Sequence, residues 1–306
     1  PRQRPQPGAG PTGHDDDVTH GPTLPESREA GLTRIQAYDG PMPSPVSIVE
    51  VLADRVRRDG SRPLLTYYPP AKGERLEFSA KSFANWVDKT ANLISEHVDD
   101  GVFVAGPLSV QHPSHWMSLI WPLACWQRGL YYSAIETPPV PEECDLIVTG
   151  PQNPRPEPPG VTFACSLHPL ALGLTGLPDG VLDYTTEALA QPDLHFQNPI
   201  KYHDGAWFDA DGGVSLGEWL ELPPQPGRVL VRPMQPRLVL SEAIARPVLG
   251  GGSAVIVDGP VTEEELARII VTERIDAEVT DPADPGQTEP PPTKTGWLGR
   301  ILGGAR

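Results

Sequence analysis

The stretch 254–279 constrains the fold most strongly, because it has the pattern of a strand, a helix and a second strand in immediate succession. Residues 254–257 form a short apolar run of β-branched type, and apolar residues alternate again over 275–279. Between them, Thr262 precedes Glu265 by three residues, which is the spacing of a capping box at the start of a helix. Two strands connected through a helix pair in parallel with a right-handed crossover. We therefore predict an α/β fold of layered, mostly parallel sheets with packed helices.

Three consecutive glycines, at 250–252, come directly before this unit and raise the question of a phosphate-binding loop. Such a loop follows a strand and opens a helix, because free N–H groups and the positive end of the helix dipole hold the anion there. These glycines instead precede the strand, and the helix that follows begins with Glu263, Glu264 and Glu265, which repel phosphate. The sequence predicts a helix stop and a tight turn at 250–252.

Further helices and strands are indicated by apolar periodicity and by capping residues on both sides of this unit. Ser47 and Ser79 are expected N-caps, and Gly129 is an expected helix stop. The expected helices begin at Ser47, follow Ser79 to about 98, run over 115–128 with a kink at Pro122, and run over 238–248. The expected strands cover 64–68 and 75–78 as a hairpin, then 102–105, 130–134, 145–149 and 229–232.

The 39 prolines and 30 glycines are unevenly placed and divide the chain. Residues 1–44 are rich in Pro, Gly and Asp and poor in apolar residues, so we expect a disordered tail. The expected domain covers 45–282, with sub-lobes of about 45–150 and 161–282 on either side of a proline-rich break. Residues 283–306 are expected to be a Pro-rich linker and C-terminal tail.

The net charge is −16, with 24 Lys and Arg against 40 Asp and Glu, and no dense basic run occurs. Nucleic acid is therefore not an expected partner. The most apolar stretch, 116–132, is too short and too polar for a transmembrane segment. The odd number of widely spaced cysteines, together with the absence of a signal-peptide pattern at the start, favours a cytoplasmic protein with reduced thiols.

Two residue pairs invite a catalytic or metal-binding interpretation. His112 and His115 lie three residues apart, but no third ligand accompanies them, so helix initiation or packing is favoured over a metal site. Cys165 and His168 resemble a nucleophile and a base, yet this spacing in an irregular segment gives weak geometry. We predict no metal site and no catalytic residues, and we interpret the aromatic residues of 116–132 as core.

Four segments of the chain resemble, in their order and their residues, successive parts of a known enzyme family. "SFANWVDKTANLISEHV", "HPSHWMSLIWPLACWQRGLYYSA", "DLIVT" and "RPVLGGGSAVIVDGPVTEEELARIIVTERIDA" resemble successive pieces of AMP-forming acyl-CoA synthetases and related adenylation enzymes. The resemblance covers about 47–282 and concerns the N-terminal portion of those enzymes. The chain is most similar to short actinobacterial AMP-binding-like proteins that carry this portion alone. The resemblance implies a truncated adenylate-forming α/β domain.

Adenylate-forming enzymes hold the ATP phosphates with a Ser/Thr/Gly-rich loop that ends in Pro-Lys-Gly. The segment 172–181 resembles a remnant of this loop, with matches at Gly173, Thr175, Gly176, Pro178 and Gly180. Leu172 and Leu174 stand at hydroxyl positions, and Asp179 stands where the family has lysine. At ~4 Å and an effective dielectric near 20, each unit charge pair is worth roughly 4 kcal/mol, so the change of sign disfavours triphosphate. An accidental match in a turn rich in Gly and Pro is the alternative.

Other parts of the family pattern are missing from the sequence: the Tyr-Gly-x-Thr-Glu segment, the ribose-binding aspartate and the C-terminal domain with its adenylation lysine. We therefore expect a pseudoenzyme without adenylation chemistry, with no cofactor and with ATP or AMP disfavoured, which acts as a binding or scaffold protein for an unknown protein partner. The alternative is a small-molecule binder, for an acyl or nucleotide ligand, or an acyl-CoA synthetase-type enzyme that needs a partner for the missing C-terminal part.

The C-terminal tail carries a short apolar motif, Trp297-Leu298-Gly299-Arg300-Ile301-Leu302, behind a Pro-rich linker. Such a motif is typical of docking on a partner or a membrane surface, and an ordinary tail is the simpler interpretation. A third hypothesis for the whole chain is an interaction protein that works through its tails. It predicts that removal of residues 1–44 and 287–306 abolishes partner capture and leaves the melting of the fold unchanged.

Overall fold

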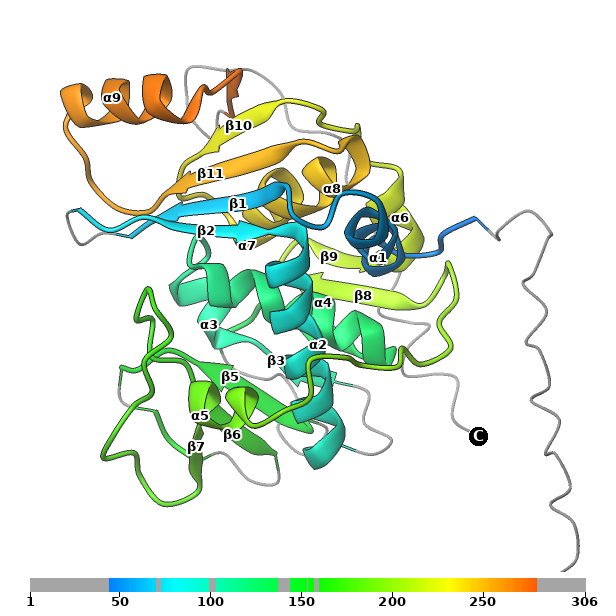
Figure 1. Ribbon diagram of the computed structural model, residues 1–306. Helices are drawn as coiled ribbons and strands as arrows, with labels where there is room; N and C mark the ends of the chain where they lie inside the picture. The colour runs from blue at the N-terminus through cyan, green and yellow to red at the C-terminus, as the bar shows by residue number, and fades with distance from the viewer. Residues whose placement is uncertain are drawn as a thin grey trace, which may run out of the picture. The chain divides into compact units, whose positions relative to one another are not determined.

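The computed structural model describes residues 44–69, 73–98, 103–136, 144–152, 154–156 and 160–279. The compact unit to which they belong begins at Ser44. The expected N-terminal tail, 1–44, lies outside the described residues except for Ser44, and the expected C-terminal linker and tail, 283–306, lies wholly outside them. Within the described part, helices and strands form a mixed α/β architecture, as the sequence predicts (Figure 1).

One sheet has the strand order β12-β10-β11-β1-β2 in the described part of the chain. All neighbouring strands in it are parallel except β1 and β2, which form the expected antiparallel hairpin. Its strands are β1 (Pro63–Tyr68), β2 (Leu76–Ser79), β10 (Arg228–Val231), β11 (Ser253–Val257) and β12 (Ala277–Glu278).

The second sheet has the order β7-β6-β5-β3-β4-β8-β9 over the described ranges. It is parallel throughout except for the hairpin of β8 and β9. Its strands are β3 (Phe103–Ala105), β4 (Tyr131–Ser133), β5 (Leu146–Thr149), β6 (Val161–Ala164), β7 (Val181–Asp183), β8 (Gly205–Asp209) and β9 (Gly212–Ser215).

Helices α2 (Ala80–His97) and α4 (Trp116–Arg128) lie between the two sheets and pack on each other (Figure 1). α4 is buried along almost its whole length, and Trp116, Trp121 and Trp126 are each at most 1% exposed. The interpretation of these aromatic residues as core is confirmed. The other helices are α1 (Ile48–Asp59), α3 (Pro107–Gln111), α5 (Tyr184–Leu189), α6 (Leu216–Leu220), α7 (Pro236–Leu240), η2 (Ser241–Ala245), α8 (Arg246–Gly250) and α9 (Glu263–Glu273).

The capping residues identified in the sequence act as predicted. Ser47 and Ser79 accept hydrogen bonds from backbone N–H groups in the first turns of α1 and α2. Thr262 and Glu265 form a complete capping box on α9. Gly129 ends α4 in the left-handed conformation, at φ 73°. These local signals act within one turn, so they are readable without knowledge of the tertiary fold.

Three features differ from expectation. β12 pairs with β10 rather than with β11, so β10 lies between the two strands that α9 connects. The break near 150–160 does not separate the sheets, since each sheet takes strands from both sides of it. The expected helix 238–248 contains a π-helical turn, η2, in which the Arg246 N–H reaches Ser241 O. Pro247, which has no N–H to donate, follows directly.

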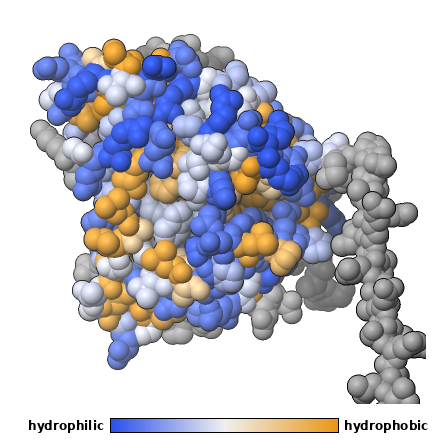
Figure 2. All heavy atoms as spheres, in the orientation of Figure 1, coloured by the Kyte–Doolittle hydropathy of each residue, from blue (hydrophilic) through white to orange (hydrophobic). Residues whose placement is uncertain are grey.

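The visible surface carries its hydrophobic side chains in several small groups among hydrophilic ones (Figure 2). Phe196, at 85% exposed, and Val271, at 78%, are the most exposed of the large hydrophobic residues described. Among the described helices, none is both long enough and apolar enough to cross a membrane.

Candidate functional site

The phosphate-loop remnant lies in the irregular connection between β6 and β7. Its matching residues Gly173, Thr175, Gly176, Pro178 and Gly180, and the non-matching Asp179, are all exposed. Gly176 and Gly180 have positive φ angles of 73° and 85°, conformations that suit glycine. The structure thus brings these residues together in one turn-rich surface loop, here called the 172–180 loop.

Asp183 holds the 172–180 loop in place, and sequence reasoning did not single it out. It ends β7 and is the N-cap of α5. Its Oδ1 accepts a hydrogen bond from the Leu174 N–H at 3.0 Å, while its Oδ2 accepts from the Thr186 N–H at 2.9 Å and the Thr186 hydroxyl at 2.6 Å. A Cβ placed on Gly173 would lie 2.6 Å from the same Oδ2. The loop is therefore folded closely around a carboxylate.

This arrangement fits poorly with the phosphates of ATP, the nucleotide that the resemblance implies. A phosphate-binding loop offers free N–H groups and a cation to the anion. Here the N–H of Leu174 is used by Asp183, and Asp179 adds an exposed acidic side chain. Two carboxylates in so short a segment oppose the approach of a triphosphate. The loop is a turn whose Leu174 N–H is bound to a carboxylate and whose neighbouring side chains are acidic.

The second glycine-rich segment, 250–252, has the structural role predicted for it. Gly250 is the last residue of α8, and Gly251 follows in the left-handed conformation at φ 74°. The Gly252 N–H donates to Gln225 O at 3.1 Å, and a Cβ on Gly252 would lie 2.3 Å from that oxygen. Glycine is required here because two backbone segments touch.

His112 and His115 occupy different environments. The Nε2 atom of His112 lies 3.1 Å from Gln152 Oε1. His115 is the N-cap of α4: its Nδ1 accepts from the Met117 N–H, and its ring packs edge-on against Tyr67. Burial, together with the charge of His112, lowers the pKa of His115 to about 3, so its ring is neutral near pH 7. The described residues include no group of three or more His, Cys, Asp and Glu arranged for a metal ion.

Cys165 and His168 are not arranged as a nucleophile and its base. Cys165 is fully buried, and this burial raises the pKa of its thiol well above the usual value. The Nδ1 atom of His168 accepts from the Leu170 N–H, which leaves the ring engaged in the local turn. A thiol that stays protonated is a poor nucleophile, and the geometry favours a structural role for both residues.

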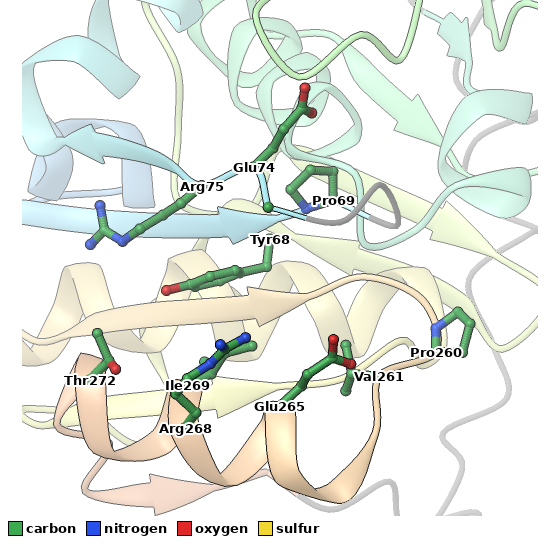
Figure 3. Close-up of a pocket in the computed structure, with 11 residues that line it drawn as sticks. Tyr68, Pro69, Glu74, Arg75, Pro260, Val261, Glu265, Arg268, Ile269 and Thr272 are labelled. Carbon is green, nitrogen blue, oxygen red and sulfur yellow. The ribbon is translucent and has the colours of Figure 1, made fainter.

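A cavity of about 280 Å³ lies elsewhere, between the β1–β2 hairpin and α9 (Figure 3). None of its lining residues belongs to the 172–180 loop. Tyr68 lies at its centre, and side chains of one stripe of α9 face the strands across it (Figure 3). The lining residues are Tyr68, Pro69, Gly73, Glu74, Arg75, Pro260, Val261, Glu265, Arg268, Ile269 and Thr272.

One end of this cavity adjoins a buried ionic network around Glu273, the last residue of α9. Glu273 is 6% exposed. Its Oε1 accepts from the Tyr68 hydroxyl at 2.5 Å and from Arg75 Nε at 2.7 Å, and its Oε2 accepts from Arg228 Nη2 at 2.5 Å. Burial opposes the charge on Glu273, but these hydrogen bonds outweigh it and lower its pKa to about 2. The network fastens the end of α9 to strands β1 and β10.

Asp183 and the network of Glu273 are only partly indicated by the sequence. Asp183 follows the apolar pair Val181-Leu182 and precedes Thr186 by three residues, which is a strand end followed by a helix cap. That pattern indicates a cap but not the loop it holds. The network of Glu273 joins residues from three distant parts of the chain, so no local pattern could have found it.

Comparison with known proteins supports the resemblance at the level of the fold. No family model matches the chain. A TIGR03089 family protein of Mycobacterium tuberculosis (strain ATCC 25618 / H37Rv) is 30% identical over 161 residues, which is 50% of this chain and 63% of that protein. The chain thus spans less than two thirds of this curated relative.

Among solved structures, the acyl-CoA synthetase of Brucella canis aligns with a TM-score of 0.59 and 18% sequence identity. The alignment covers 78% of this chain and 48% of that enzyme. The similarity is one of architecture, since identity this low carries no information about activity. The chain therefore has an acyl-CoA synthetase-like α/β fold, which extends over about half the length of that enzyme.

Proposed function

We propose that this chain is a non-catalytic binding or scaffold protein built on an acyl-CoA synthetase-like fold. The observation that carries the proposal is the environment of the 172–180 loop. Asp183 accepts the Leu174 N–H, and Asp179 is an exposed acidic residue of the same loop. Adenylation develops negative charge on phosphoryl oxygens, and a preorganised positive environment must stabilise that charge. Carboxylates at this position do the opposite.

The proposal includes a cytoplasmic location and an actinobacterial origin. Cys125, Cys144 and Cys165 are free and buried, which agrees with a reducing compartment. The similarity to the Mycobacterium tuberculosis protein supports the origin. Neither point assigns a ligand.

Exchange of radioactive pyrophosphate into ATP tests the absence of adenylation directly. The purified chain is incubated with Mg-ATP, pyrophosphate and a panel of short, medium and long-chain carboxylic acids. We expect exchange at the level of a no-protein blank for every acid. Exchange above the blank that disappears when the 172–180 loop is altered by Gly173→Trp would refute the proposal, because it would show a working phosphate site.

The alternative of an acyl or nucleotide binder at the loop predicts a deep apolar pocket bordered by Thr175 and Gly176. Both residues are exposed, and the 280 Å³ cavity described above is lined by other residues. A structure with an acyl or nucleotide ligand bound against Thr175 and Gly176 would favour the alternative over the scaffold proposal.

A further inference from the structure

The cavity beside α9 has the form of a groove between a helix and a hairpin, and we call it the α9 groove. Glu265, Arg268, Ile269 and Thr272 follow one another at helical spacing and face the hairpin across it (Figure 3). Opposite them lies Tyr68, near the carboxyl end of β1. A groove along a helix accepts an elongated occupant, such as a peptide segment.

The α9 groove is apolar at its floor and charged at its rim, with an excess of acidic side chains near the first turn of α9. The floor consists of the Tyr68 ring, Val261 and Ile269, and Ile269 is only 7% exposed. The Tyr68 hydroxyl donates to Glu273, so the ring is held in position. Glu74 lies on the rim, and the first turn of α9 contributes Glu263, Glu264 and Glu265 nearby. Arg75 and Arg268 also line the groove, and Arg75 is ion-paired with Glu77 and Glu273. Such a surface suits an occupant with bulky apolar side chains next to a positive charge.

One segment of this chain has that composition. Trp297 to Leu302 places Trp, Leu, Ile and Leu around Arg300. Residues 294–306 contain Lys294, Arg300 and Arg306 and no acidic residue, although the chain as a whole has a net charge of −16. The segment lies outside the described residues. Its charge is opposite to that of Glu74 and of the three glutamates in the first turn of α9.

The sheet topology places Val279, the last described residue before this tail, at the edge of the sheet where Tyr68 lies. β12 is parallel to β10, β11 and β1, so Val279, just after β12, lies at the same carboxyl edge as Tyr68 and Pro69. Three strand spacings separate β12 from β1, which is about 14 Å at ~4.8 Å for each spacing. Residues 280–296 are 17 in number, and 17 residues can span up to roughly 55 Å when fully extended. The linker is therefore long enough to bring Trp297 into the groove.

We propose that the segment Trp297–Leu302 binds in the α9 groove of its own chain, with Trp297 on the Tyr68, Val261 and Ile269 floor and Arg300 beside the acidic side chains of the rim. The covalent connection gives the segment an effective concentration in the millimolar range, so even weak contacts keep the groove occupied. The groove then becomes available to another apolar, basic peptide only when the tail leaves it.

A competition experiment on the full chain tests this proposal. A fluorescent peptide of residues 292–306 is titrated into the wild-type chain and into the full-length Trp297→Glu variant, and anisotropy is measured. We expect the peptide to bind the variant at least about tenfold more tightly, because the tethered segment no longer competes. Equal affinities, or no binding to Trp297→Glu, would overturn the proposal.

A pair of charge reversals locates the binding surface. In the Trp297→Glu background, Glu74→Lys changes the rim of the α9 groove, whereas Glu136→Lys makes the same charge change at an exposed residue after β4. We expect Glu74→Lys to weaken peptide binding about threefold relative to Glu136→Lys. Equal effects of the two substitutions would contradict binding at this groove.

Light scattering distinguishes binding of the tail in the groove of its own chain from binding in the groove of a second copy. We expect wild-type chain and Trp297→Glu to have the same molar mass at equal concentration. A wild-type dimer that dissociates in Trp297→Glu would assign the groove to the tail of a second copy and refute the intramolecular contact. Binding of the wild-type chain to anionic vesicles that is lost in Trp297→Glu, without peptide binding to either protein, would assign the tail to a membrane surface and refute the groove as its docking site.

Discussion

The segments 172–180 and 250–252 are both rich in glycine and differ in what surrounds them. At 250–252, the glycines lie against the backbone of Gln225, and there is no room for a side chain on Gly250 or Gly252. In the 172–180 loop, a Cβ placed on Gly176 would meet no atom within 4 Å, and Asp183 fixes the loop through Leu174. One N–H in each segment is bound within the protein: that of Leu174 to Asp183, and that of Gly252 to Gln225 O. Glycines therefore show where the backbone turns or touches, and the neighbouring charges decide whether an anion can bind.

The largest expected effect is that of Gly252→Ala. The new Cβ would lie 2.3 Å from both Gln225 O and Gly227 O, which are backbone atoms and cannot move aside independently. We expect a loss of about 3 kcal/mol in the free energy of unfolding, measured by urea denaturation followed by tryptophan fluorescence. A loss below about 1 kcal/mol would show that the two backbone segments are not in contact.

Gly176→Ala is the matched control in the other segment. It meets no neighbouring atom, but Gly176 has a φ of 73°, so only conformational strain opposes the substitution. We expect a cost of about 1 kcal/mol, clearly smaller than that of Gly252→Ala. A larger cost would mean that the loop is packed rather than open.

The next effect concerns Glu273, at the end of α9. This helix follows the 250–252 turn and β11 in the chain. Glu273→Gln leaves Arg75 and Arg228 without their carboxylate, and we expect a loss of about 3 kcal/mol or slightly less at pH 7. Because the folded-state pKa of Glu273 is lowered from 4.5 to about 2, its stabilisation is complete above pH 4.5 and declines as the pH falls toward 2. The difference in stability between wild type and Glu273→Gln should shrink over that interval.

Urea denaturation at a series of pH values measures this difference. His115, whose folded-state pKa of about 3 is below its usual 6.5, destabilises both proteins equally as the pH falls below 6.5, so it cancels in the comparison. A difference between wild type and variant that is independent of pH from 6 to 2 would exclude the ionised network.

A smaller effect is expected for Asp183→Ala in the loop. The substitution removes the N-cap of α5 and the bond to the Leu174 N–H, which together contribute about 1–2 kcal/mol. We also expect faster cleavage of the 172–180 loop by a broad-specificity protease. Thr186→Val, which removes one hydroxyl bond to Asp183 and retains the backbone contacts, serves as the control and should change cleavage much less.

The smallest effect on stability is expected for Asp179→Lys, which restores the residue type of the adenylating enzymes at an exposed position. Stability should change by less than about 0.5 kcal/mol. ATP binding should not appear, because Asp183 still uses the Leu174 N–H. Micromolar ATP binding by this variant would show that Asp179 alone accounts for the loss of the site.

Local structure is largely predictable from the sequence where a single turn decides the outcome. Ser79, Gly129 and the Thr262–Glu265 pair mark helix ends correctly, because capping involves neighbours only a few residues apart. The segment 161–220 is much harder to assign. Its elements β6 to β9, α5 and α6 are three to six residues long, which is too short for a periodic pattern.

Relations between distant residues were not predictable. The crossover through α9 correctly implied parallel strands, but the insertion of β10 between β11 and β12 depends on pairing that lies outside the motif. In the same way, the 172–180 loop was located by residue type, whereas the hydrogen bond from Leu174 to Asp183 depends on the tertiary structure. The residues of the 172–180 loop were identified in the sequence, whereas Asp183, which holds the loop, and the network of Glu273 were not.

Isothermal titration calorimetry of the wild-type chain with Mg-ATP tests the central claim, that the 172–180 loop has lost the chemistry of a phosphate site. We predict no saturable heat up to millimolar ATP. Saturable heat with a micromolar dissociation constant, abolished by Gly173→Trp, would contradict the claim and would direct attention to an acyl substrate.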